Sequence, residues 1–218
     1  MRDLSNDTVI QINKNGLSYL QFKVLNNLGV PHAFMLKCDD FNLKPKEKAY
    51  TASELTRAYK GICDSLNIEV SNIVRPFQKH TANVKYIDKV YEGFLLDSVD
   101  GLITDKKDMI LATTNADCIL YLLYDKQKKI IANIHSGWRG SYQRIIENTI
   151  DVFVNELGSR PEDIIVCICP SIRKCCFEVD TDVKDMFYER FSFVENISSY
   201  IINGYKPGKY FIDTVRTK

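Results

Sequence analysis

The chain has 218 residues, and 45% of them are hydrophobic, which is enough to bury one sizeable core. Lys and Arg total 29 against 28 for Asp and Glu, so the net charge of +1 argues against a nucleic acid or an acidic membrane as partner. Residues 1–15 lack the apolar stretch of a signal peptide, and no apolar run approaches the roughly 18 residues that span a bilayer. We therefore expect a cytoplasmic protein that acts on a small molecule, of open oligomeric state.

Seven cysteines are spread irregularly along the chain, an odd number that does not suit a framework of disulfides. We expect reduced thiols. Cys167 and Cys169 lie two residues apart in an apolar run, so both should face the same side of a strand and be buried. Cys175 and Cys176 are adjacent, which is a poor spacing for two ligands of one metal ion, and we leave them out of the candidate site.

The first half of the chain predicts a hairpin, a helix and several short strands. Residues 9–12 and 17–22 are extended, and the Asn-Gly pair between them supplies the positive φ values of a tight turn. From Thr51, a suitable N-cap, residues 51–66 carry apolar side chains at helical spacing. Short extended segments follow at residues 73–74, 84–87, 101–104 and 109–113.

The second half predicts alternating strands and helices. Hairpins mixed with helical crossovers indicate an α+β fold, with mixed β-sheets in a layered sandwich flanked by helices. We expect a single domain over residues 1–218. The expected elements are strands at residues 119–124, 130–134 and 164–169 and helices at residues 141–157 and 180–191.

Two reactive side chains flank the predicted hairpin at residues 119–134. If Lys126 and Gln127 form the centre of its turn, Cys118 lies directly opposite His135. Directly opposed residues have Cβ atoms about 4.5–5.5 Å apart, close enough to share a metal ion or a proton. The hairpin therefore predicts a thiol and an imidazole in one site.

His80 ends an extended segment among polar residues, where a lone histidine is usually a surface residue. Together with Cys118 and His135 it would form a set of three ligands with one position open, which is typical of a catalytic zinc site. Without metal, the same cysteine and histidine form a couple suited to nucleophilic attack. The residues alone leave both readings open.

The segment after His135 predicts an anion site. Gly137 and Gly140 let the backbone approach a ligand closely, and Arg139 offers a planar fork of donors. A helix expected from about Ser141 would add free amides and the positive end of its dipole. This combination suits a phosphate or a carboxylate, although two turn glycines and a surface ion pair of Arg139 are an equal alternative.

Four motifs together resemble the laccase-domain family. They are Gln-Lys-His at residues 78–80, Asn-Ala-Asp-Cys at 115–118, His-Ser-Gly-Trp-Arg-Gly-Ser at 135–141 and Cys-Cys-Phe-Glu-Val at 175–179. The resemblance covers roughly residues 32–218. Older names of this family are polyphenol oxidase and multicopper oxidase, and its members are now described as purine nucleoside phosphorylases.

The resemblance implies a metal site and an activity. In the family, the positions of His80, Cys118 and His135 bind a catalytic metal, usually taken to be zinc. The implied activity is phosphorolysis of adenosine, inosine and methylthioadenosine, with adenosine deaminase activity as well. Arg139 is then the candidate for holding the phosphate, with Gly140 and Ser141 beside it, and Asp117 is a weaker candidate for a proton shuttle.

The residues argue against one alternative function and leave two others open. The older family names imply copper and phenol oxidation, but the chain has only three histidines and a multicopper cluster needs many more. A thiol hydrolase that uses Cys118 and His135 is a second possibility. A third is a degenerate member that binds nucleosides without catalysis, because the loop near Lys37 departs from the family's pattern and we expect the family's C-terminal segment to be absent.

Overall fold

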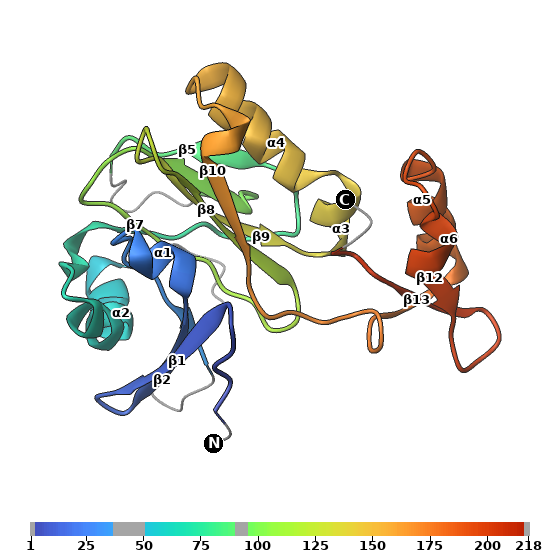
Figure 1. Cartoon of the computed structure of the whole chain (residues 1–218), viewed down its shortest axis with the longest axis horizontal. Helices are drawn as coiled ribbons and strands as arrows, with labels where there is room; N and C mark the ends of the chain where they lie inside the picture. The colour runs from blue at the N-terminus through green and yellow to red at the C-terminus, as the bar shows by residue number, and fades with distance from the viewer. Residues whose placement is uncertain (1–2, 37–50, 90–95, 216–218) are drawn as a thin grey trace. The chain divides into compact units, whose positions relative to one another are not determined.

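A computed structural model describes residues 3–36, 51–89 and 96–215 (Figure 1). The loop near Lys37, on which the hypothesis of a degenerate member depends, lies outside these residues. The prediction of an α+β fold with mixed sheets and helices is confirmed. The chain divides into two compact units, unit 1 with Met1–Arg75, Ile87–Leu96 and Thr104–Ala112, and unit 2 with Pro76–Tyr86, Asp97–Ile103 and Thr113–Lys218.

Unit 1 begins with the predicted hairpin. Strands β1 (Val9–Lys14) and β2 (Leu17–Phe22) pair antiparallel, and β3 (Phe34–Met35) adds a third strand on the other side of β2. Asn15 and Gly16 form the turn with φ values of 55° and 77°, a conformation that asparagine and glycine tolerate best. The predicted hairpin is confirmed.

The predicted helix of unit 1 is α2 (Ala52–Leu66). It begins at a capping box, in which Thr51 Oγ1 accepts the N–H of Glu54 while the Glu54 carboxylate accepts the N–H of Thr51. Its apolar face packs with the hairpin in one core. The other elements of unit 1 are helix α1 (Lys23–Asn27), the 3-10 turn Val70–Asn72 and the parallel strands β4 (Ile73–Val74) and β7 (Ile110–Leu111).

His32 is buried in unit 1 and its ring is held in one neutral form. Its Nε2 accepts the N–H of Phe22 at 2.7 Å, and its Nδ1–H donates to the carbonyl of Val30 at 2.8 Å. Burial lowers the pKa of His32 below its usual value, and the bond to Val30 offsets part of this effect. A second proton would place a donor on Nε2 against the Phe22 N–H.

We therefore expect the protein to lose stability in mild acid. A histidine whose pKa is lower in the folded state stabilises the fold at pH values above its unfolded pKa of about 6.5, and this contribution is lost as the pH falls below that value. Denaturant unfolding at pH 7.5, 6.5 and 5.5 should give a falling free energy of unfolding for the wild type and a flatter profile for His32→Gln. Parallel profiles for the two proteins would contradict this role of His32.

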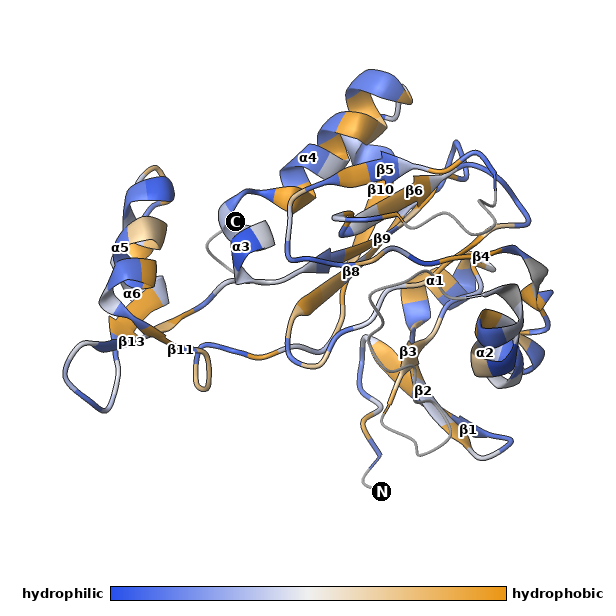
Figure 2. Ribbon diagram, turned by 180° about the vertical axis from the view of Figure 1, so that it is seen from behind, coloured by the Kyte–Doolittle hydropathy of each residue, from blue (hydrophilic) through white to orange (hydrophobic). Residues whose placement is uncertain are grey.

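Unit 2 contains a five-stranded sheet in the order β10-β8-β9-β6-β5. The pair β5 and β6 is parallel, whereas β8 pairs antiparallel with both β9 and β10, so the sheet is mixed. Figure 2 shows β8 largely in the colour of hydrophobic residues, as expected for a strand that is buried on both faces. The strands are β5 (Val84–Tyr86), β6 (Gly101–Thr104), β8 (Ile119–Asp125), β9 (Ile131–Ser136) and β10 (Ile164–Ile168).

The register of the β8–β9 hairpin differs from the prediction by two residues. His135 lies opposite Leu120, not opposite Cys118. The cause is Asp125, which belongs to the strand: its N–H donates to the carbonyl of Ile130, and its Oδ1 accepts the N–H groups of Gln127 and Lys128. The turn is therefore centred one position later. Because the slip is an even number of residues, the predicted faces of the strands are unchanged.

The helix that we expected to start at Ser141 begins elsewhere. A short helix α3 (Trp138–Tyr142) follows β9, Arg144 adopts a left-handed conformation with a φ of 63°, and α4 (Ile145–Asp151) then continues into the π-helical turn Val152–Glu156. The predicted stop at Gly158 is confirmed, with a φ of 65°. In Figure 1, α4 lies along one face of the sheet, where its buried residues join the sheet's core.

The last part of unit 2 is a three-stranded antiparallel sheet in the order β11-β13-β12, covered by α5 (Figure 1). Phe187 and Phe191, which come from the predicted helix, are fully buried in its core. Among the described residues, no helix has the length and hydropathy to cross a membrane. The elements are the 3-10 turn Pro161–Asp163, β11 (Glu178–Asp180), α5 (Thr181–Arg190), α6 (Ile197–Tyr200), β12 (Ile201–Asn203) and β13 (Lys209–Ile212).

The thiols of Cys167, on β10, and of Cys169, just after this strand, are buried as their spacing predicts. Cys167 and Cys169 are both buried and both are free thiols. Burial raises the pKa of Cys167 to about 11 and that of Cys169 to about 12, so both stay protonated at neutral pH. They are structural residues of the sheet.

Candidate metal centre

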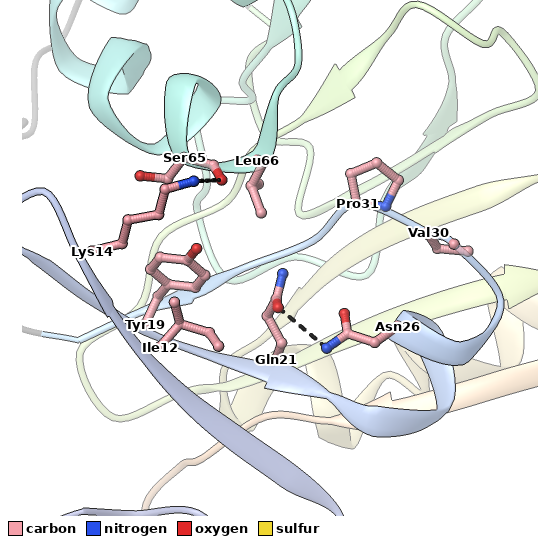
Figure 3. Close-up of a pocket in the computed structure, with 10 residues that line it drawn as sticks. Ile12, Lys14, Tyr19, Gln21, Asn26, Val30, Pro31, Ser65 and Leu66 are labelled. Carbon is pink, nitrogen blue, oxygen red and sulfur yellow. Dashed lines mark hydrogen bonds between the residues drawn. The ribbon is translucent and has the colours of Figure 1, made fainter.

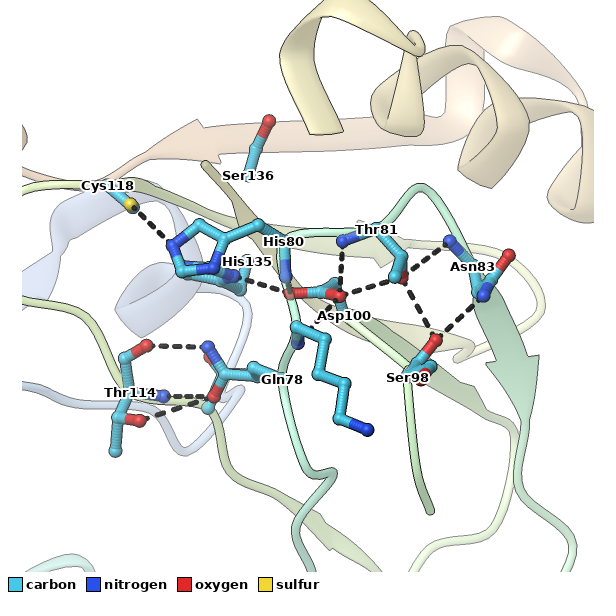
Figure 4. Close-up of polar contacts among 12 residues, drawn as sticks. Gln78, His80, Thr81, Asn83, Ser98, Asp100, Thr114, Cys118, His135 and Ser136 are labelled. Atoms are coloured by element: carbon cyan, nitrogen blue, oxygen red, sulfur yellow. Dashed lines mark hydrogen bonds and ion pairs between the residues drawn. The ribbon is translucent and has the colours of Figure 1, made fainter. Parts of the chain in front are cut away.

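Three segments of unit 2 bring His80, Cys118 and His135 together (Figure 4). The candidate ligand atoms of these side chains all lie within 4.8 Å of one another. Cys118 Sγ and His80 Nε2 are 3.6 Å apart, and the rings of His80 and His135 meet edge to face with their centroids 5.0 Å apart. Cys118 immediately precedes β8 and His135 lies within β9, so the hairpin holds two of the three groups.

The spacing of the cluster fits a tetrahedral metal ion. Zinc binds sulfur at about 2.3 Å and imidazole nitrogen at about 2.0–2.1 Å, and a tetrahedral angle then separates the two donor atoms by about 3.6 Å. Cys118 Sγ and His80 Nε2 lie at that separation. One thiol and two imidazoles are also ligands of the type that zinc prefers. The three side chains can therefore hold a metal ion.

His80 reaches the cluster because Gly137 has no side chain. A Cβ atom at Gly137 would stand 2.1 Å from Cδ2 of His80, far inside van der Waals contact. Gly137 itself has an ordinary extended backbone, with φ −66° and ψ 171°. The sequence predicts that Gly137 lets the backbone approach a bound anion, and in the structure the group that approaches it closely is the ring of His80.

Asp100 is a member of the site that the sequence did not reveal. It is fully buried immediately before β6, and its Oδ1 accepts the Nδ1–H of His135 at 2.8 Å. The same carboxylate accepts the backbone N–H groups of His80 and Thr81 and the hydroxyl of Thr81 (Figure 4). The one sequence signal for Asp100 is an acidic residue at the start of an apolar strand. Its contact with His135 follows only from the topology of the sheet.

The charges of the site follow from these contacts. For His135, burial acts to lower the pKa, but the hydrogen bonds to Asp100 and Cys118 outweigh burial and raise the pKa to about 9. For Asp100, burial acts to raise the pKa, and the bonds from His135 and Thr81 bring it below its usual value. Burial and the charge on His135 both lower the pKa of His80, which favours the neutral imidazole that binds metals.

The side chain of Gln78 joins the two segments that carry His80 and Cys118. Its Nε2 donates to the carbonyl of Thr114 at 2.7 Å, and its Oε1 accepts the N–H of Thr114 at 2.8 Å. The carboxamide thus makes the pair of hydrogen bonds to Thr114 that the backbone of a neighbouring strand would make in a sheet. Gln78 belongs to the first of the four sequence motifs, and this pairing gives it a structural role.

The residues predicted to bind an anion lie beside the cluster. Arg139 is exposed, with its guanidinium carbon 4.3 Å from the centre of the Trp138 ring, and its charge contributes to the lowered pKa of His80. A Cβ at Gly140 would stand 2.8 Å from the carbonyl oxygen of Thr81, so glycine is required for packing there. Ser141 is fully buried, and its Oγ lies 3.0 Å from Oγ of Ser136.

The remaining candidates lie outside the cluster. Asp117 is exposed, and its carbonyl accepts the N–H of Ile172. Its carboxylate is not among the group of ligand atoms that converge within the described residues. Cys175 and Cys176 are exposed, with their sulfur atoms 3.2 Å apart, which agrees with leaving them out of the metal site.

A hollow of about 360 Å³ in unit 1 has a different character (Figure 3). The polar groups around it bind one another: Lys14 Nζ donates to the carbonyl of Ser65, and Asn26 Nδ2 donates to Oε1 of Gln21. The Nε2 group of Gln21 donates to the carbonyl of His32. The described residues that line this hollow include no cluster of catalytic or metal-binding side chains, and we assign it no function.

Comparisons with known proteins show the family of this chain. Residues 35–217 match the sequence profile of a family described as multi-copper polyphenol oxidoreductase laccase. A purine nucleoside phosphorylase from Bacteroides thetaiotaomicron is 35% identical over 148 residues, which are 65% of this chain and 54% of that protein. Adenosine deaminase RL5, from an unknown prokaryotic organism, is 29% identical over 155 residues, which are 68% of this chain and 58% of that protein.

A solved structure shows the same fold. The hypothetical protein YfiH from Bacillus licheniformis superposes with a TM-score of 0.72 at 21% identity, over 98% of this chain and 80% of that one. The matched region spans little more than half the length of the two curated relatives. This chain therefore shares the fold of YfiH. The two curated relatives are longer proteins, and their named activities belong to those whole proteins.

Proposed function

The chain belongs to the laccase family of multi-copper polyphenol oxidoreductases, and from that premise we propose that it is a metal-dependent purine nucleoside phosphorylase with adenosine deaminase activity. The observation that carries the proposal is the convergence of His80, Cys118 and His135 within 4.8 Å, beside the exposed guanidinium of Arg139. Relatives that are named for these two activities support it. The proposed substrates are adenosine, inosine and methylthioadenosine, with phosphate.

Zinc is the metal that we propose for this site. Two imidazoles and a thiolate with an open fourth position are typical of catalytic zinc, whereas a multicopper cluster needs more histidines than this chain has. When bound, the ion supplies a Lewis acid that polarises the purine or a water molecule. His80 and Cys118, at the exposed side of the cluster, leave that position accessible to a nucleoside.

Phosphorolysis also needs a phosphate-binding site, which we propose is formed by Arg139, Gly140 and Ser141. Phosphate attacks C1 of the ribose as the bond to the purine breaks. Hydrogen-bond donors such as a guanidinium must therefore hold the negatively charged phosphate near the cluster. The Arg139 guanidinium lies over Trp138 and acts electrostatically on His80. Gly140 lets the turn that carries Arg139 pack against the carbonyl of Thr81, and Ser141 fixes this turn through Ser136.

Asp117 stays the candidate for a proton shuttle. Its carboxylate is exposed one residue before Cys118, and protonation of the leaving purine requires a donor from the chain or from water. We expect Asp117→Asn to reduce the rate of both reactions if it moves that proton.

Substitution of Arg139 separates the two reactions. Loss of a charged donor to phosphate costs about 1.5–3 kcal/mol, so Arg139→Met should raise the KM for phosphate by roughly 10- to 100-fold. Deamination of adenosine uses no phosphate and should change by less than about twofold. Arg190→Met, which removes an exposed arginine from α5, is the matched control and should leave both reactions unchanged. Equal losses in both reactions for Arg139→Met would contradict a phosphate role.

The substrate assay for the whole proposal uses adenosine, inosine and methylthioadenosine, each with and without phosphate. Chromatography of the products should show free purine base only with phosphate, and inosine from adenosine in either case. If inosine yields no base and adenosine yields no inosine, the proposed function is wrong.

A thiol hydrolase is the alternative, because Cys118 and His135 lie within reach of each other. The hydrogen bond to Cys118 contributes to the raised pKa of His135. Such an enzyme would be inactivated by an alkylating reagent and indifferent to a chelator. The phosphorylase should instead lose activity when the chelator removes the metal and regain it with zinc.

A further inference from the structure

We propose that Asp100 is the positioning residue of the metal site, because one buried carboxylate holds both histidine ligands, His135 through its ring and His80 through its backbone. This inference rests on the metal site of the proposed function. It concerns a residue that contacts the proposed ligands without binding the metal itself, and it predicts how tightly the site binds a metal ion.

The first contact fixes the ring of His135. Asp100 Oδ1 and His135 Nδ1 are 2.8 Å apart, and their side chains are 0% and 4% exposed. A carboxylate accepts, so Nδ1 carries the proton and the lone pair that remains for a metal lies on Nε2. The backbone is tied at the same place, since the N–H of His135 donates to the carbonyl of Asp100 at 2.7 Å.

The second contact fixes the backbone of His80. The N–H groups of three consecutive residues point at the Asp100 carboxylate: Lys79 at 3.3 Å, His80 at 3.1 Å and Thr81 at 2.7 Å. The Thr81 hydroxyl adds a fourth donor at 2.7 Å. Successive amides that converge in this way form a concave site for an anion, and here the anion is a side chain of the protein.

The conformation of His80 depends on this arrangement. His80 has a φ of 59°, in the left-handed region that residues with a Cβ avoid. Converging hydrogen bonds from Lys79, His80 and Thr81 to one buried acceptor hold the backbone there. Without the acceptor, the segment is free to return to an extended conformation, which would carry the imidazole away from Cys118.

An asparagine at position 100 cannot keep all the contacts of the aspartate. Its side chain has the shape of aspartate but offers one acceptor oxygen and one NH2 group, which only donates. With the NH2 group in place of Oδ1, it faces two donors, the Nδ1–H of His135 and the N–H of His80. With the NH2 group in place of Oδ2, the oxygen still accepts from both histidines, but the NH2 group faces the N–H groups of Lys79 and Thr81. The first orientation releases the ring of His135, and the second removes the two hydrogen bonds that flank His80.

The test measures metal binding in the absence of nucleoside. Zinc affinity at pH 7.5 is determined by competition with a chromophoric chelator, and cobalt(II) is used as a second probe because its visible spectrum reports ligand geometry. We expect Asp100→Asn to bind zinc about 10- to 100-fold more weakly than the wild type, with an altered cobalt spectrum. Circular dichroism and thermal unfolding check that each variant is folded.

Asp97→Asn is the matched control. Asp97 lies three residues earlier on the same segment and pairs with Lys79 at 2.8 Å, but both side chains are about half exposed. The control should bind zinc like the wild type. If Asp100→Asn does not fold, Thr81→Val removes one donor to the carboxylate at nearly constant shape, and about a threefold loss of zinc affinity is expected from it.

Two results would overturn the inference. One is wild-type zinc affinity together with a wild-type cobalt spectrum in Asp100→Asn. The other, if that variant does not fold, is unchanged affinity in Thr81→Val. Failure of the proposed function looks different: a wild type that binds zinc and loses affinity on substitution of Asp100, yet releases no purine from inosine, contradicts the phosphorylase and leaves the role of Asp100 intact.

Discussion

Replacement of His80 or His135 by alanine, or of Cys118 by serine, should abolish stoichiometric zinc binding and the phosphate-dependent release of hypoxanthine from inosine. The three side chains are the converging donors of the site, so each variant leaves two protein ligands. Sites with four protein ligands bind zinc with about 10–16 kcal/mol, or roughly 2.5–4 kcal/mol for each ligand, so we expect a loss of roughly 60- to 700-fold in affinity. Metal analysis after gel filtration measures the first effect, and chromatography of the products measures the second.

The chain offers a matched control for the cysteine. Cys176→Ser removes an exposed thiol that lies outside the cluster, and it should retain both zinc and activity. Thermal unfolding should show that Cys118→Ser is folded. Full activity in a metal-free Cys118→Ser protein would contradict the account, because neither the zinc site nor the thiol hydrolase functions without this sulfur.

Substitution of Gly137 by alanine should disable the site through a single methyl group. The new Cβ would stand 2.1 Å from Cδ2 and 3.1 Å from Cγ of His80, so the imidazole must move. The backbone at Gly137 suits alanine, with φ −66° and ψ 171°, which makes the expected effect purely steric. A displacement of about 1 Å in a catalytic group costs on the order of 100-fold in rate, and we expect a loss of that order.

The control for this substitution is Gly61→Ala in α2. There the new Cβ would meet Cδ1 of Leu17 at 3.2 Å, the end of a flexible side chain, and alanine favours the helix by up to about 1 kcal/mol. Zinc affinity, activity and thermal unfolding are measured for both variants. Gly137→Ala should bind zinc weakly while remaining folded, and unchanged zinc affinity in this variant would show that His80 is not held as described.

The parts of the fold that the sequence predicts well are those with strong local chemistry. The Asn15-Gly16 turn and the Thr51 capping box each place donors and acceptors within a few residues of one another, so the pattern determines the geometry. The same holds for the thiols of Cys167 and Cys169, whose spacing of two residues places both on one buried face.

The hairpin shows where local patterns are insufficient. Polar composition located the turn between β8 and β9, but the register depends on which residue starts it, and the Asp125 side chain settles that by accepting two N–H groups of the turn. Cys118 and His135 still share a face, because the slip is even. The break at Arg144 was missed for a related reason, since a left-handed residue other than glycine or asparagine has no sequence signal.

Asp100 marks the limit of a prediction from residue types. Its partners lie 19 to 35 positions away in the chain, and the topology of the sheet alone brings them together. The three candidate metal ligands could be proposed because their chemistry is rare in this chain and matches a known set of zinc ligands. A buried aspartate has no such signature, although it contacts two of them.

The most direct test of the central claim is the dependence of inosine cleavage on both phosphate and zinc in one purified, untagged protein. We predict that hypoxanthine and ribose 1-phosphate form in equal amounts with phosphate present, that neither forms without phosphate, and that a chelator stops the reaction until zinc is restored. Release of hypoxanthine that is indifferent to both phosphate and chelator, or no release under any of these conditions, would contradict the account.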